Sequence, residues 1–314
     1  MNYGTEESEE PRPGRERLVF LQQIVNGLVI GGVYALFALG FTLIFGIHKI
    51  MNLAHGGIFM TGAFIGLYSV QAGLPLWLAF ILAMFGAGLV SVIIEVTAFR
   101  RLRQSGEVEF SALISSIGAN LVLVSVAQML SKTQVLRFPF DTFPVVIFKV
   151  WGLRVSALQL AMAVLAILLV AGLSWYLYRT GFGRQVRAVA QNERAALLAG
   201  IRPSVIYFQT FMLSGMLAGA AGVLVGLAFN SIHFMMGDPF LLRGFVVVIL
   251  GGLGSVAGAL VASLGFGVLQ TLSVAYLSSR LSDIIIFGLL FAVLLLRPNG
   301  LFGQDEAGVL RGRR

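Results

Sequence analysis

The stretch Leu160-Ala-Met-Ala-Val-Leu-Ala-Ile-Leu-Leu-Val-Ala-Gly-Leu173 decides the fold class, because no position in it carries a polar side chain. A strand of a membrane β-barrel would alternate apolar and polar residues over about ten positions, and this run does not alternate. Together with the residues around it, the run reaches the roughly 20 apolar residues that a helix needs to cross a bilayer. The stretch therefore predicts a transmembrane helix.

Similar runs fill most of the 314 residues. Hydrophobic residues make up 58% of the chain and charged residues only 11%, with a mean hydropathy of +0.91, whereas soluble proteins carry roughly 25% charged residues. We therefore expect an all-α polytopic integral membrane protein with eight to ten transmembrane helices. The apolar segments cover residues 18–46, 53–71, 75–99, 111–130, 156–178, 204–229, 244–262, 262–278 and 284–296.

The basic residues indicate how these helices are oriented. The net charge of +8 comes from Lys and Arg that are dispersed over loops and tails, which is typical of the positive-inside rule and not of nucleic-acid binding. Arginines in 100–103, in 179–202 and near the C-terminus place those segments in the cytoplasm, and the loop 131–155 then faces outward. Arginines within 1–17 favour an inside start, which requires an even number of passes before Arg100.

Three parts follow along the chain. Residues 1–17, rich in Glu, Arg and Pro, predict a disordered N-terminal tail. Residues 18–297 form the transmembrane domain, which contains a basic loop over 179–203. Residues 298–314 form a cytoplasmic C-terminal tail.

A polar cluster over residues 46–57 interrupts the first apolar region. Residues 18–71 would measure about 80 Å as one helix, against about 30 Å of hydrocarbon, so we expect a broken or re-entrant segment here. Two interpretations of Asn52, His55 and Gly56 stay open. Asn52 caps the following helix and His55 bonds a neighbouring carbonyl, or these residues lie on a substrate path, as broken helices in transporters often do.

Few residues have side chains that suggest catalysis or ion binding. Glu95 is an acid well inside an apolar run, and an intramembrane charge is by default a functional hypothesis. It also lies only five residues before Arg100, so snorkelling or pairing at the inner boundary is the alternative. The chain has no cysteine, no clustered histidines and no lysine in a phosphate-binding loop. We expect no metal site, no cofactor and no enzymatic activity.

The basic loop is the segment best suited to a partner. Arg187, Gln191 and Arg194 follow a 4,3 spacing, which predicts one shared helix face across the mouth of the bundle. Elsewhere, glycines at helical spacing predict closely packed helices; they are Gly27/Gly31, Gly62/Gly66 and Gly215/Gly219/Gly222/Gly226. The glycine-rich stretch 250–259 predicts a tight turn or a re-entrant corner.

Several motifs occur in the order typical of one family. They are Tyr34–Gly46 followed by Met51–Gly56, then Phe110–Gly118, Gly183–Ile201, Val248–Gly258 and Leu296–Phe302. Over residues 20–303 the chain thus resembles the LivH-type permease subunits of branched-chain amino acid ABC importers. The resemblance implies a bacterial inner-membrane subunit that works with a homologous second permease, two cytoplasmic ATPase subunits that hydrolyse the ATP, and an extracytoplasmic substrate-binding protein.

The basic loop is similar to the segment of ABC importers that couples to the ATPases, whose pattern is Glu-Ala-Ala, three residues, then Gly. Arg194 stands at the acidic position, while the two alanines and the glycine keep their places. The coupling residues implied are Arg184, Arg187, Arg194, Ala195, Ala196 and Gly200.

The substrate stays open at this point. Met51 and Leu53 replace the residues more usual beside Asn52, and Gln270 stands where many relatives carry an acid. Branched-chain amino acids are the expected substrates, and urea, amides or other amino acids are the alternatives within the same architecture. An ion-coupled secondary transporter would need an intramembrane site, for which only Glu95 is available. A receptor or scaffold without transport is a further alternative.

Overall fold

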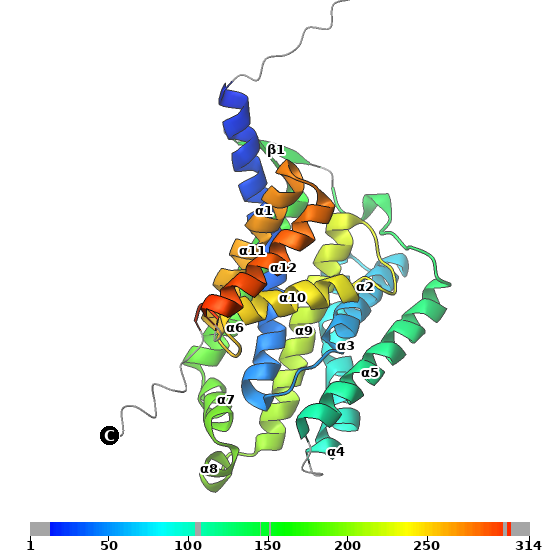
Figure 1. The fold of residues 1–314 in the computed structure, drawn as a ribbon. Helices are drawn as coiled ribbons and strands as arrows, with labels where there is room; N and C mark the ends of the chain where they lie inside the picture. The colour runs from blue at the N-terminus through cyan, green and yellow to red at the C-terminus, as the bar shows by residue number, and fades with distance from the viewer. Residues whose placement is uncertain (1–12, 104–107, 145, 151, 298–299, 303–314) are drawn as a thin grey trace, which may run out of the picture.

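A computed structural model describes residues 13–103, 108–144, 146–150, 152–297 and 300–302, and this part of the chain is almost wholly helical (Figure 1). The helices are α1 (Pro13–His48), α2 (His55–Gln71), α3 (Leu76–Ile94), α4 (Arg100–Leu102), α5 (Val108–Ser131), α6 (Ala157–Arg179), α7 (Gly181–Gln191), α8 (Glu193–Leu198), α9 (Pro203–Phe229), α10 (Gly237–Gly251), α11 (Val256–Tyr276) and α12 (Ser279–Leu296). A π-helical turn, Glu95–Phe99, joins α3 to α4, and the strands β1 (Ile147–Val150) and β2 (Leu153–Ser156) form an antiparallel hairpin.

Six helices in the described part of the chain are long and apolar enough to cross a membrane. They are Glu16–His48, Leu76–Leu102, Phe110–Ser131, Ala157–Arg179, Pro203–Phe229 and Val256–Tyr276. The protein is therefore an all-α multi-pass membrane protein, as predicted. This measure does not confirm the count of eight to ten, because α2 and α10 have only 17 and 15 residues and the apolar part of α12 covers only Leu281–Leu296.

Two predicted boundaries are wrong. The segments 244–262 and 262–278 divide at the wrong place, because α10 ends at Gly251 and α11 is continuous from Val256. The turn between them lies within the glycine-rich stretch, as predicted, and is made by Gly252 (φ 98°) and Gly254 (φ 84°). The predicted tail over 1–17 is too long, because α1 already begins at Pro13; residues 1–12 lie outside the described part.

The bundle has two ends, which we name by what lies there. The hairpin face carries β1 and β2, and the coupling face carries α7 and α8 at the bottom of Figure 1. Near the start of α1, Gln22 exchanges hydrogen bonds of 2.8 Å with the backbone N–H and C=O of Arg154 on the hairpin face. At the end of α1, His48 lies beside Arg103 and Tyr207 on the coupling face. The start of α1 therefore lies on the face opposite the basic loops, whereas the sequence predicted that both lie on the same side.

The helices α1–α2–α3 and α9–α10–α11 form two repeats of opposite orientation. Lys49 and Asn230 follow α1 and α9 with positive φ (55° and 44°), and Gly73 and Gly254 follow α2 and α10 with φ of 87° and 84°. The members of both pairs are 181 residues apart. The packing is reciprocal, since α1 packs most extensively on α11 and α3 on α9. Inverted repeats of this kind are a recurring plan of transporters.

Glycines make the close helix contacts, as the spacing predicted. A Cβ on Gly62 would lie 2.3 Å from Gly219 Cα, and one on Gly222 would lie 2.0 Å from the backbone oxygen of Phe59. On the other side of the bundle, a Cβ on Gly27 would lie 2.6 Å from Val268 Cα. Side chains at these positions would push the repeats apart.

Candidate functional site

The break between α1 and α2 covers residues 49–54 and is organised by Asn52. Its side-chain Oδ1 accepts a hydrogen bond from Ala54 N–H (3.1 Å), and its backbone oxygen accepts one from His55 N–H (3.2 Å). Asn52 is only 1% exposed. Asn52 therefore shapes the turn that leads into α2. The prediction that it caps this helix is wrong, because the N-cap residue is Ala54, two residues further along.

His55 is fully buried at the start of α2. Its Nε2 lies 3.1 Å from the backbone oxygen of Phe37, which confirms the predicted bond to a neighbouring carbonyl. Phe37 precedes the end of α1 by 11 residues, or about 16 Å along the helix, so α2 begins deep inside the bundle. Gly40 makes room for the ring, because a Cβ there would lie 3.0 Å from His55 Cε1. The role of Asn52 and His55 on a substrate path stays a prediction.

The first turns of α2 and α10 meet inside the molecule. A Cβ on Gly237 would lie 2.2 Å from the backbone oxygen of Gly56, so only glycine allows this approach. Three residues further along each helix, Phe59 and Phe240 stack with centroids 4.9 Å apart. From there α10 runs across the bundle (Figure 1), and the turn after it brings Gly254 against Gly46 near the end of α1. Two helix N-termini, each with a partial positive charge, are thus paired at the centre.

Ser116 of α5 holds the break in place, although it was not among the residues predicted from the sequence. Its Oγ accepts a hydrogen bond from Leu53 N–H (3.1 Å) and donates to the backbone oxygen of Leu113 (2.7 Å). Ser116 is fully buried. Ser116 belongs to the motif Phe110–Gly118, on which the family resemblance partly rests. The motif itself does not indicate that Ser116 contacts the break.

A polar network closes the bundle at the coupling face. Glu95, 3% exposed, pairs with Arg103, which confirms pairing at the inner boundary but with a partner three residues beyond Arg100. The Arg103 Nη1 lies 3.3 Å from His48 Nδ1, and its guanidinium lies 4.2 Å from the centre of the Tyr207 ring. Glu95 is also the first residue of the π-helical turn. Turns of this kind are common at functional sites.

The basic loop folds as two helices and not as one. Asn192 interrupts the chain between α7 and α8, and its side chain accepts a hydrogen bond from Ala195 N–H (3.0 Å). The prediction that Arg187, Gln191 and Arg194 share one face is therefore wrong. Arg187 donates to the backbone oxygen of Leu177 and so fastens α7 to the end of α6.

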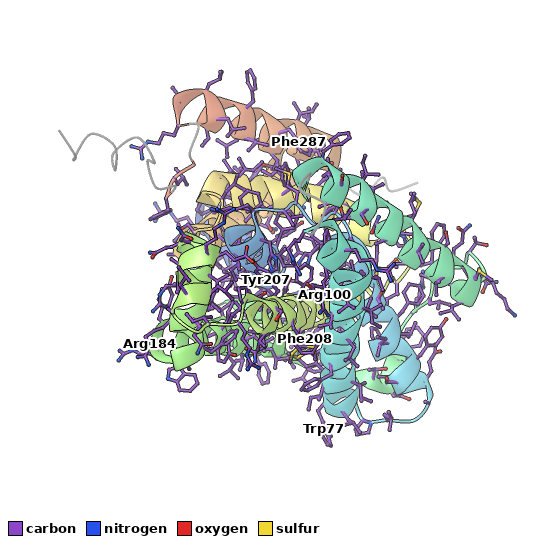
Figure 2. All side chains as sticks on the ribbon, turned by 90° about the horizontal axis from the view of Figure 1, so that it is seen from below. Trp77, Arg100, Arg184, Tyr207, Phe208 and Phe287 are labelled. Carbon is purple, nitrogen blue, oxygen red and sulfur yellow. The ribbon has the colours of Figure 1, made fainter. Side chains whose placement is uncertain are left out.

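The outer surface of α7 and α8 combines charge with apolar side chains. Arg184 and Arg194 are exposed, and Leu197 and Leu198 are 59% and 90% exposed. In Figure 2, which views the molecule from below, Arg184 projects at the edge while Tyr207 lies inside the bundle. Of the other predicted coupling residues, Ala195 is exposed, Ala196 is buried, and Gly200 ends α8 with φ 83°.

Contacts connect this surface to the break. Glu193 of α8 lies within hydrogen-bonding reach of the Tyr207 hydroxyl. The Tyr207 ring lies 4.2 Å from the ring of His48, the last residue of α1. A displacement of α8 would therefore reach the break through two side chains.

Two cavities lie beside these elements. One of about 500 Å³ opens between the end of α1, α7 and the turn before α11, and Lys49 and Arg187 line it. The other, of about 330 Å³, is lined by Tyr34, Arg243 and Gln270. Among the described residues, no three His, Cys, Asp or Glu side chains cluster as a metal site would require.

The family model for the permease component of branched-chain amino acid transport systems matches residues 23–294. The chain belongs to this family. It is 32% identical over 299 residues to the high-affinity branched-chain amino acid permease BraD of Pseudomonas aeruginosa, covering 91% of this chain and 97% of BraD. It is 30% identical over 301 residues to LivH of Escherichia coli K12, covering 92% and 97% of the two chains.

A solved structure shares the fold. An inward-facing ABC transporter of the metal-chelate type is 15% identical, with a TM-score of 0.51, and the match covers 93% of this chain and 92% of that one. At this identity the likeness concerns the fold alone. The family membership confirms the resemblance drawn from the motifs, and the chain is a transport subunit.

Proposed function

We propose that this protein is the permease subunit of an ATP-binding-cassette importer of branched-chain amino acids. The observation that carries the proposal is the family match over residues 23–294, which spans both inverted repeats and the break. Its partners would be a homologous second permease, two cytoplasmic ATPases that hydrolyse ATP, and an extracytoplasmic binding protein. The relatives BraD and LivH are named for the same transport.

The coupling face is then the cytoplasmic face of a bacterial inner membrane. Arg100, Arg101 and Arg103 lie there together with the arginines of α7 and α8, in agreement with the positive-inside rule. The hairpin face, including the start of α1, is extracytoplasmic. With α2, α10 and α12 counted as parts of passes, the described part of the chain crosses the membrane nine times.

The ATPases dock on the exposed surface of α7 and α8. Leu197 and Leu198 supply the apolar contact, and Arg184 and Arg194 supply charge at its rim. Closure of the ATPases moves α8, and Glu193, Tyr207 and His48 transmit the movement to the break. The two repeats then rock against each other about the contact of α2 with α10.

The docking surface is tested by charge reversal. The double variant Arg184→Glu/Arg194→Glu should lose co-purification with the ATPases, while the permease itself stays folded in detergent. Lys132→Glu/Arg137→Glu, an equal change in the exposed loop of the hairpin face, should co-purify normally. Arg187 is left unchanged because it fastens α7 to α6. Normal assembly of the double variant would place the contact elsewhere.

The substrate route passes the break at Asn52, His55 and Gly56. All three are buried in this conformation, and rocking of the repeats would open them to water. The chain has no native cysteine, so single cysteines at 52–56 report cleanly. Labelling by a water-soluble thiol reagent should change with the nucleotide state of the complex; protection in every state would leave these residues a packing role alone.

The substrate class is tested by competition. In cells that carry the complete transporter, unlabelled leucine, isoleucine and valine should each suppress uptake of labelled leucine. If urea or an acidic amino acid competes and the three branched-chain amino acids do not, the substrate assignment is wrong, although the permease assignment stands.

A further inference from the structure

A cavity of about 330 Å³ lies between α1, α6, α9, α10 and α11. The roles proposed above for the break and for the surface of α7 and α8 do not involve this cavity. Ser231 and His233, in the connection that leads from α9 on the hairpin face into α10, contribute to its wall. The volume is at the lower end of the range for small-molecule sites, about 300–1,000 Å³. A small solute fits a cavity of this volume.

One end of the cavity is polar and cationic. Arg243 of α10 lines it and forms an ion pair with Asp283 of α12, with the Nη2 3.1 Å from Oδ1. The hydroxyl of Tyr34 lies within hydrogen-bonding reach of the same guanidinium. A guanidinium has five N–H donors in a planar fork, and these two partners leave donors for a carboxylate, which arginine binds in bidentate fashion.

The same end offers an acceptor. The side-chain Oε1 of Gln270 on α11 is buried and has no hydrogen-bond partner, while the amide lies within reach of Tyr34. A buried acceptor without a partner is destabilising. A rotation of the side chain that turns this oxygen toward the cavity would let the ammonium group of a ligand satisfy it.

Apart from Ser231 and His233, the rest of the wall is apolar. Ile30 and Val33 of α1, Met162 of α6, Val225 of α9 and Met236 before α10 surround the polar end. A branched aliphatic side chain placed here loses contact with water and meets only apolar groups. A cation, a free acceptor and an aliphatic wall in one cavity are the complement of a small zwitterion with an apolar side chain.

We propose that this cavity is a binding site for the transported amino acid. The carboxylate binds Arg243 and the Tyr34 hydroxyl, the ammonium faces Gln270 Oε1, and the side chain lies against the aliphatic wall. The site rests on the proposed function, and it adds a substrate-selecting step within the permease itself. It lies at the start of α10, beside the Phe59–Phe240 stack, so movement of the repeats would alter it.

Photo-crosslinking locates the site directly. A diazirine analogue of leucine is delivered by the binding protein to the complete complex, and the labelled peptides are identified by mass spectrometry. Label is expected in the peptides that contain Met162 and Met236, and excess leucine should remove it. Label confined to residues 46–57 or to other helices, in a complex that imports leucine, would overturn the proposal.

Substitution of the cation tests its role. Arg243→Met should reduce leucine uptake about tenfold or more, as expected for the loss of a hydrogen bond between charged groups, and Arg243→Lys should restore most of it. Assembly and ATPase stimulation by the loaded binding protein should stay unchanged, which separates loss of the site from misfolding or failed docking. Arg154→Met, an exposed arginine on the hairpin face, serves as the control.

Uptake by Arg243→Met at the unsubstituted rate would overturn the site and leave the importer assignment standing. Failure of the unsubstituted complex to import leucine at all would overturn the proposed function, and the site with it.

Discussion

Replacing Gly237 by alanine tests the contact between the two repeats with a single methyl group. The new Cβ would lie 2.2 Å from the backbone oxygen of Gly56 and 2.6 Å from its carbonyl carbon. Both atoms belong to the backbone, so no rotamer change relieves the clash. Ordinary contact begins at 3.4 Å, and α2 and α10 must therefore separate by about 1.2 Å at the point where they meet.

The expected cost follows from overpacking. Extra volume in a well-packed interior costs about 1–3 kcal/mol, which lowers the melting temperature by about 2–10 °C in a chain of this size. Gly56→Ala should cost less, because its Cβ would lie 3.0 Å from the nearest atom, Gly237 O. Gly265→Ala is the matched control: it adds the same methyl in α11 where nothing lies within 4 Å, and it should leave stability unchanged or raise it by up to about 1 kcal/mol.

Thermal unfolding of the three variants in detergent, followed by the loss of the monodisperse peak, measures this order. Substrate uptake by the reconstituted complex measures whether the displacement also blocks the movement of the repeats. If Gly237→Ala melts and transports like the Gly265→Ala control, α2 and α10 are not in contact and the reasoning from this geometry fails.

Three further predictions concern the side chains around the break. Glu95→Gln should destabilise the protein by about 3 kcal/mol, because it leaves the Arg103 guanidinium without its partner; the double variant Glu95→Gln/Arg103→Gln should recover part of this in the same unfolding assay, and no recovery would argue against a direct pair. Tyr207→Leu should leave assembly with the ATPases intact and lower the number of substrate molecules moved per ATP, and an unchanged ratio would remove Tyr207 from the path between α8 and the break. Ser116→Ala should cost about 1–2 kcal/mol through the unsatisfied Leu53 N–H and increase thiol labelling of a cysteine at 52, whereas unchanged labelling would show that α5 does not hold the break.

The sequence was sufficient for the fold class and for two of the breaks between helices. Continuous apolar runs require helices in a bilayer, and the polar residues 46–57 and the glycines of 250–259 lie where α1 and α10 stop. The orientation of α1 relative to the basic loops was predicted wrongly. The arginines before α1 were taken to mark the same side of the membrane as the arginines of the basic loops. The interruption at Asn192 was missed because a 4,3 spacing of side chains does not reveal a residue that caps a new helix.

The site was only partly predictable, for a physical reason. His55 and Asn52 stood out as polar residues between apolar runs, and Glu95 as an acid near an arginine. Ser116 and the cluster around Arg243 depend on contacts between helices far apart in sequence, and no local pattern marks them. The inverted repeat is visible in backbone features, such as the positive φ of Lys49 and Asn230. Different residue types adopt these conformations in the two halves, so the repeat is not apparent from the sequence.

ATP-dependent uptake of labelled leucine into proteoliposomes tests the central claim most directly. The complete complex, with this chain, the second permease, the two ATPases and the binding protein, should accumulate leucine only when the ATPases can hydrolyse ATP. Collapse of proton and sodium gradients should not stop it. Uptake by this chain alone, driven by an ion gradient and indifferent to ATP, would contradict the assignment and establish a secondary transporter in its place.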